Sequence, residues 1–212
     1  MADAPTAQLA YGRTELDDHD HLPTSTGLSN EKLTMWAFLG SECLLFGALI
    51  SVYLLVRNVP DELEGVGVKI SEAFDIPFTS VSAFVLLMSS LTMVLAVQAI
   101  AQGDDKQTRL WLMTTGLFGT IFLAGQVYEF TIFYNEGFGY TTNISTSAFY
   151  TLTGFHGVHV ALGIVMLASL WYMSHAGRLT QKNAETVEIV GLYWHFVDIV
   201  WIVIFGIVYL IP

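Results

Sequence analysis

Seven ionisable side chains stand inside, or at the mouth of, long apolar stretches of this sequence, and they are its best candidates for chemistry. They are Glu42, Glu129, His156, His159, Glu188, His195 and Asp198. Histidine and carboxylate side chains are common donors and acceptors of protons in enzymes. Because removing an ionisable group from water costs free energy, each of these positions needs a partner or a role.

The last apolar stretch carries three of these groups at helical spacing. His195 and Asp198 are three residues apart, and Glu188 precedes His195 by seven, so a helix would place them on one face. Glu42, a few residues into the first stretch, is expected at a similar depth. We hypothesise that Glu42 pairs with the stripe formed by His195 and Asp198. Pairing of this kind either supports proton conduction or simply makes these ionisable side chains tolerable inside the membrane.

A second polar layer is expected from the third and fourth stretches. His156 and His159 are three apart and share a helical face, and Glu129 lies near the far end of the preceding stretch. We hypothesise that Glu129 pairs with His156 or His159. For this layer, the alternative that these groups only hold neighbouring helices together remains open.

The histidine pattern argues against a metal or haem on this chain. Two axial ligands of a haem must face each other at one depth, whereas His156 and His159 are expected at a different depth from His195. Catalytic zinc needs three clustered protein ligands. His19 and His21 stand among aspartates near the start of the chain, where a solvated tail is favoured over a metal site. We therefore expect no cofactor, metal site or catalytic residue here.

The elements that must position these side chains are five apolar stretches. The chain has 212 residues, of which 53% are hydrophobic and 13% charged, whereas soluble domains are about one-quarter charged. About 20 apolar residues cross the bilayer core as a helix, and the alternating segments of a membrane barrel are absent. The sequence predicts an all-α, polytopic membrane protein: a polar, mobile tail over 1–30, then a membrane domain over 31–212 with helices at about 33–57, 78–102, 109–134, 146–174 and 187–211.

Basic residues predict the orientation of these helices. The tail and the second and fourth connections share one side of the membrane and carry six of the eight lysines and arginines. Because basic residues favour the cytoplasmic side, the N-terminus is predicted to be cytoplasmic and the C-terminus outside. The net charge of −11 argues against a nucleic-acid partner.

Four short strings of residues carry a resemblance to a known family. The fourth stretch reads Gly-Phe-His-Gly-Val-His-Val at 154–160, and the fifth reads Tyr-Trp-His-Phe-Val-Asp-Ile-Val-Trp at 193–201. The first holds Gly-Ser-Glu at 40–42, and the third holds Gln-Val-Tyr-Glu-Phe at 126–130. In this order they resemble subunit III of haem-copper oxidases, such as cytochrome c oxidase, over residues 31–212.

The resemblance is to the short, five-helix bacterial form of that subunit. The mitochondrial type has seven helices, and whether the missing two are absent or supplied by another subunit stays open. The family implies a bacterial inner-membrane subunit of a proton-translocating oxidoreductase, with haem and copper in subunits I and II. It further implies packing on subunit I, bound phospholipid, support of proton uptake, and protection of the complex during turnover. Membership of a respiratory supercomplex and a contact role for the acidic tail remain open.

By motif match, Glu42 resembles the family's buried helix carboxylate and Glu129 its helix-three carboxylate, while His195 and Asp198 resemble its last-helix pair. Two alternatives share these motifs: subunit III of a quinol oxidase and an accessory protein of nitric-oxide reductase. The electron donor is chosen by another subunit, so this sequence does not separate them. A proton-coupled transporter is disfavoured, because no proline interrupts the five stretches and no internal repeat is evident.

Overall fold

The computed structural model describes residues 29–57 and 75–211, and these form helices joined by short connections. The long helices are α1 (Asn30–Val56), α2 (Ile76–Ala101), α3 (Asp105–Asn135), α4 (Ile144–His175) and α5 (Ala184–Phe205). A 3₁₀ turn, η3 (Gln181–Asn183), precedes α5, and a π-helical turn, η4 (Gly206–Leu210), continues it. All five long helices are apolar and long enough to cross a membrane, so the predicted all-α, multi-pass fold is confirmed. The predicted tail lies almost entirely outside the described residues.

Polar residues at the helix ends explain where most of the helices start. Asp75 caps α2, Asp104 caps α3, and Asn143 caps α4 in a capping box with Thr146. Such side chains accept hydrogen bonds from backbone N–H groups that have no partner within the helix. At the other ends, a glycine in the left-handed region follows α2, α3 and α4 and lets the chain reverse (Gly103, Gly137 and Gly177).

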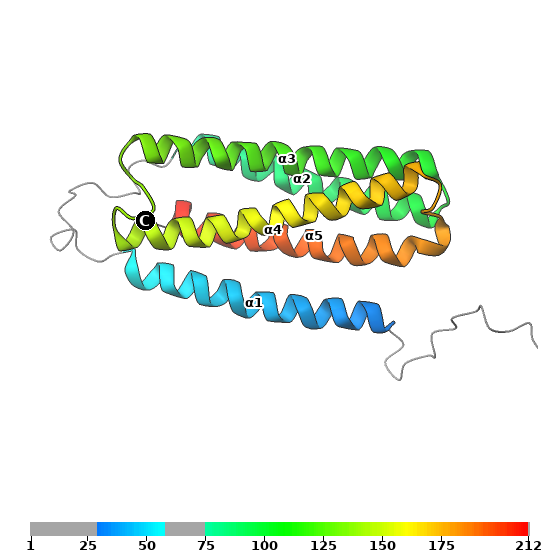
Figure 1. Ribbon diagram of the computed structural model, residues 1–212, viewed down its shortest axis with the longest axis horizontal. Helices are drawn as coiled ribbons and strands as arrows, with labels where there is room; N and C mark the ends of the chain where they lie inside the picture. The colour runs from blue at the N-terminus through cyan, green and yellow to red at the C-terminus, as the bar shows by residue number, and fades with distance from the viewer. Residues whose placement is uncertain (1–28, 58–74, 212) are drawn as a thin grey trace, which may run out of the picture.

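The helices α2 to α5 form a four-helix bundle, and α1 lies outside it along α4 and α5 (Figure 1). Within the bundle, α3 packs against α2 and α4, and α5 closes the ring by packing against α2 and α4. Large buried side chains fill the centre, among them Trp194, Trp201, Phe122 and Phe149.

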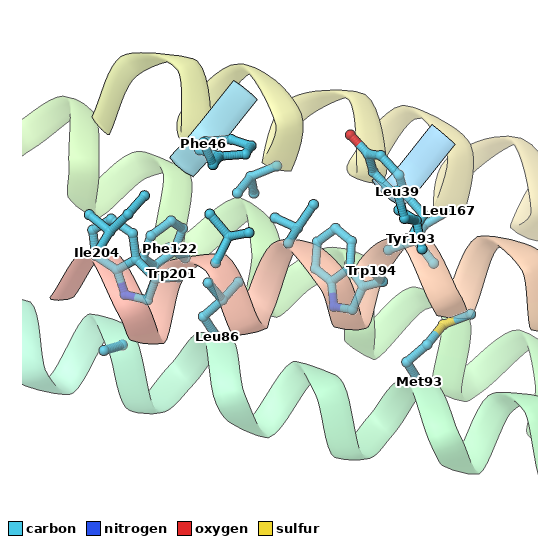
Figure 2. Packing of buried hydrophobic residues seen from close by; sticks show 14 of the residues in the cluster. Leu39, Phe46, Leu86, Met93, Phe122, Leu167, Tyr193, Trp194, Trp201 and Ile204 are labelled. Atoms are coloured by element: carbon cyan, nitrogen blue, oxygen red, sulfur yellow. The ribbon is translucent and has the colours of Figure 1, made fainter. Parts of the chain in front are cut away.

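Trp194 is the side chain that joins all four helices of the bundle (Figure 2). Its indole ring lies between two glycines, because a Cβ atom on Gly119 of α3 would be 2.5 Å from ring atom Cη2, and one on Gly163 of α4 would be 2.7 Å from Cε3. Its N–H donates to the hydroxyl of Ser89 on α2 at 2.9 Å. The two glycines therefore provide the space that a fully buried indole needs.

Helix α1 is attached to the bundle along a narrow stripe. Its buried residues are Leu39, Phe46 and Tyr53, spaced seven apart, which is the spacing of a helix that contacts neighbours on one side only. At one end Lys32 forms an ion pair of 2.8 Å with Glu188, and at the other Arg57 donates to the carbonyl of Ile207 at 3.3 Å. Large apolar side chains on the rest of α1, such as Leu44 and Leu55, are exposed.

Candidate functional site

The candidate site with the clearest capacity for proton chemistry is the contact between Glu42 on α1 and His159 on α4. Glu42 Oε2 and His159 Nε2 are 3.1 Å apart, and both side chains are nearly buried, with exposed fractions of 14% and 11%. Each residue lies near the middle of its helix. The ring of Phe46, one turn from Glu42, packs against the imidazole at 5.0 Å between centroids.

The hydrogen bonds of His159 define where its protons lie. Nδ1 is 2.7 Å from the backbone carbonyl of Phe155. Because a carbonyl oxygen only accepts, Nδ1 carries a proton. A hydrogen bond between Nε2 and Glu42 then needs one further proton, held by either the imidazole or the carboxyl group. The pair therefore holds one shared proton and has no net charge in either arrangement.

This pairing corrects the hypothesis that Glu42 pairs with His195 and Asp198. Helix α4 is 32 residues long, so His159 lies near mid-height rather than in an outer layer. Helix α1 packs against α4 as well as α5, which brings Glu42 to His159. The division into two polar layers is wrong, because α4 is long enough for His159 to lie at the depth of Glu42 on α1.

His195 and Asp198 instead face α2. The Nδ1 atom of His195 is 2.6 Å from the hydroxyl of Ser90. That hydroxyl also lies near the Asp198 carboxyl group, but neither oxygen of Asp198 has a hydrogen bond of good geometry among the described residues. The sequence does not identify Ser90 as the partner of His195, because a single serine within an uncharged stretch does not stand out from its neighbours.

Glu129 lies near the end of α3, and no histidine is among its hydrogen-bond partners within the described residues. It is 5% exposed and accepts a hydrogen bond of 2.8 Å from Thr79 on α2, and the Tyr209 hydroxyl also bonds to it. The hypothesis of a pair with His156 or His159 is therefore wrong. Glu129 lies close to the end of α3, level with the start of α2.

His156 is fully buried among aromatic rings rather than beside a carboxylate. Its imidazole stacks on Trp201 at 4.8 Å between centroids and meets the Phe122 ring edge-on at 5.8 Å. Neither ring nitrogen has a hydrogen-bond partner within the described part of the chain. On α3, one turn from Phe122, the Gln126 side chain donates a hydrogen bond to the backbone carbonyl of Thr153 at 2.8 Å and so connects α3 to α4.

Glu188, which was grouped with the buried polar residues, lies at the end of the bundle. Its side chain is 47% exposed and pairs with Lys32. This contact fastens α1 to α5, and the neighbouring Glu185 accepts a hydrogen bond from Ser29 at the same end. Among residues 29–57 and 75–211, no three His, Cys, Asp or Glu side chains gather closely enough to hold a metal ion.

Known proteins resemble the chain over most of its length. The family model described as cytochrome c oxidase subunit III matches residues 14–211. Cytochrome c oxidase subunit 3 of Bacillus sp. (strain PS3) is 40% identical over 181 residues, covering 85% of this chain and 86% of that protein. The Bacillus subtilis (strain 168) protein of the same name is 37% identical over 182 residues, covering 85% and 86%.

A protein named for a different electron donor is also similar. The probable quinol oxidase subunit 3 of Staphylococcus saprophyticus is 37% identical over 180 residues, covering 85% of this chain and 88% of that protein. Both relatives are named as subunit 3 of an oxidase. With its five membrane helices and a match along nearly its whole length, the chain belongs to the cytochrome c oxidase subunit III family.

Proposed function

We propose that this chain is the non-redox subunit III of an aerobic cytochrome c oxidase in a bacterial inner membrane. In this proposal it packs on subunit I, near subunit II, and those partners carry the haem and copper. Its N-terminus lies in the cytoplasm, in keeping with the distribution of lysine and arginine. The 40% identity to an oxidase subunit 3 from Bacillus supports the proposal.

The observation that carries the supporting role in proton uptake is the Glu42–His159 pair. It holds one shared proton, it is not completely buried, and it lies at the junction of α1 with α4. The pair is neutral while it holds one proton, so it can relay protons without an uncompensated charge only if the arrival of one proton is matched by the release of another. We propose that it helps to supply protons to the partner subunit that reduces oxygen.

The exposed flanks of α1 support a role in binding lipid and in the durability of the complex. Helix α1 contacts only α4 and α5 to any extent among the described helices, and large apolar side chains such as Leu44 and Leu55 are more than three-quarters exposed. We assign phospholipid acyl chains to these flanks. Lipid held there would shield the contact with subunit I during turnover.

Sustained turnover of the purified oxidase tests this role. We expect complexes with and without the chain to begin reducing oxygen at similar rates, and the complex lacking it to lose activity sooner. Restoring the purified chain should restore the lifetime. If removal abolishes the initial rate while subunits I and II and their haems stay intact, the chain is essential to the reaction and the supporting role is wrong.

A quinol oxidase is the second candidate, because a probable quinol oxidase subunit 3 is nearly as similar as the cytochrome c oxidase subunits. The purified complex distinguishes them by its electron donor. We expect it to oxidise reduced cytochrome c. Oxidation of a quinol without activity towards cytochrome c would favour the second candidate.

A further inference from the structure

The interface between α2 and α5 carries a row of polar groups through the middle of the bundle. Trp194 donates to Ser89 at 2.9 Å, and His195 contacts Ser90 at 2.6 Å. Each of these polar groups on α5 has a partner on α2, as buried polar groups in proteins normally do.

Two buried polar groups further along α5 are less well satisfied. Asp198 is 3% exposed and Trp201 is 2% exposed. The Trp201 indole nitrogen lacks a hydrogen bond within the described residues. The Asp198 oxygens lack one of good geometry there, although the Ser90 hydroxyl lies near them. The two residues are three apart on one helix, so their side chains are neighbours. One is an acceptor and the other is a donor only.

The helix register shows what these groups face. The indole nitrogens of Trp194 and Trp201 both lie on the side of α5 towards α2 (Figure 2). Since Trp194 meets Ser89 and the two helices are antiparallel, seven residues further along α5 places Trp201 level with Ser82 and Ala83 on α2. The Ser82 hydroxyl lies towards Gly125 on α3. Ala83 is small and buried, so neither residue places a large side chain opposite Trp201.

We propose that ordered water is bound inside the bundle between α2 and α5, where it accepts from the indole N–H of Trp201 and donates to the carboxyl group of Asp198. The Ser90 hydroxyl, which lies near the Asp198 carboxyl group, is a further partner, and the water then has two to four polar contacts, as buried water usually does.

The chemistry of the site selects water over other ligands. A metal cation would suit Asp198 but cannot be ligated by an indole N–H, and an anion would suit the indole but not the carboxylate. A lipid chain offers no hydrogen bond to either group. Water satisfies both because it donates and accepts.

Radiolytic hydroxyl-radical footprinting of the intact oxidase complex in ¹⁸O-labelled water tests this proposal. A bound water produces radicals at its own position and therefore marks an adjacent side chain that bulk solvent does not reach. Trp194 is the matched control, because it lies on the same helix, is equally buried and already has Ser89 as its partner. We expect severalfold more ¹⁸O at Trp201 than at Trp194, whereas equal, background labelling of both would overturn the proposal.

Variants at Asp198 sharpen the test. Asp198→Asn retains an acceptor of similar shape and should keep the label at Trp201, whereas Asp198→Leu removes the acceptor and should lower the label to the level of Trp194. Full labelling of Trp201 in an assembled Asp198→Leu complex would show that Asp198 does not hold the water. If that variant does not assemble, the comparison of Trp201 with Trp194 in the unmodified complex decides.

Discussion

Replacing Gly163 with alanine is predicted to destabilise the bundle, although alanine is the better helix former. The new Cβ atom would lie 2.7 Å from two ring carbons of Trp194. Ordinary contact begins at about 3.4 Å, so the ring would have to retreat by about 0.7 Å. Movement of the ring is restricted, because Gly119 lies against ring atoms Cη2 and Cζ2 and the ring N–H donates to Ser89.

The cost can be estimated from these contacts. Forcing extra atoms into a well-packed core costs about 1–3 kcal/mol, while exchanging glycine for alanine inside a helix returns up to about 1 kcal/mol. We therefore expect Gly163→Ala to lower the free energy of unfolding by up to about 2 kcal/mol, and by about 1–3 kcal/mol relative to an alanine substitution in open space, where only the gain applies. The measurement is unfolding of the purified chain in mild detergent with increasing amounts of SDS, followed by circular dichroism.

Gly154 on the same helix is the matched control, because a Cβ atom there meets nothing within 4 Å. Gly154→Ala should leave the stability unchanged or raise it slightly. If Gly163→Ala proves as stable as Gly154→Ala, the indole is not confined between two helix backbones and the description of the core is wrong.

Three further predictions concern hydrogen bonds and charges. Glu42→Gln keeps an acceptor for His159 and should leave assembly intact with only a modest change in proton uptake or durability; loss of oxygen reduction in an assembled complex would contradict the proposed role. Ser89→Ala leaves the indole N–H of Trp194 buried without a partner and should cost about 1–3 kcal/mol in the SDS assay; a smaller loss would mean that this bond contributes little. Lys32→Met removes a partly exposed ion pair and should change stability by no more than about 1 kcal/mol; a larger loss would show that this pair contributes more to the attachment of α1 than its exposure suggests.

The helices could be predicted closely from the sequence, because the bilayer imposes a strong rule on each apolar stretch. Charged residues interrupt the hydropathy at both ends, and caps such as Asp104 and Asn143 mark the helix starts. Predicted boundaries near residues 109 and 187 were a few residues too far inside the helices. The first turns of α3 and α5 are polar and extend beyond the apolar stretch.

The partners of the polar residues could not be predicted from spacing alone. Spacing shows which residues share a face, as with His195 and Asp198, but not which neighbouring helix that face meets. Glu42 pairs with His159 because α1 lies against α4, and His195 contacts Ser90 because α5 lies against α2. Serine and threonine are common within apolar stretches, so their presence there did not predict that Ser90 would contact His195 or that Thr79 would donate to Glu129.

Affinity purification through a tag on this chain, in gentle detergent, tests the central claim most directly. The dithionite-reduced minus oxidised absorption spectrum of the product is then recorded. The proposed function predicts haem bands together with co-purifying oxidase subunits I and II. A colourless product containing only this chain, under conditions that keep other oxidase complexes intact, would contradict it.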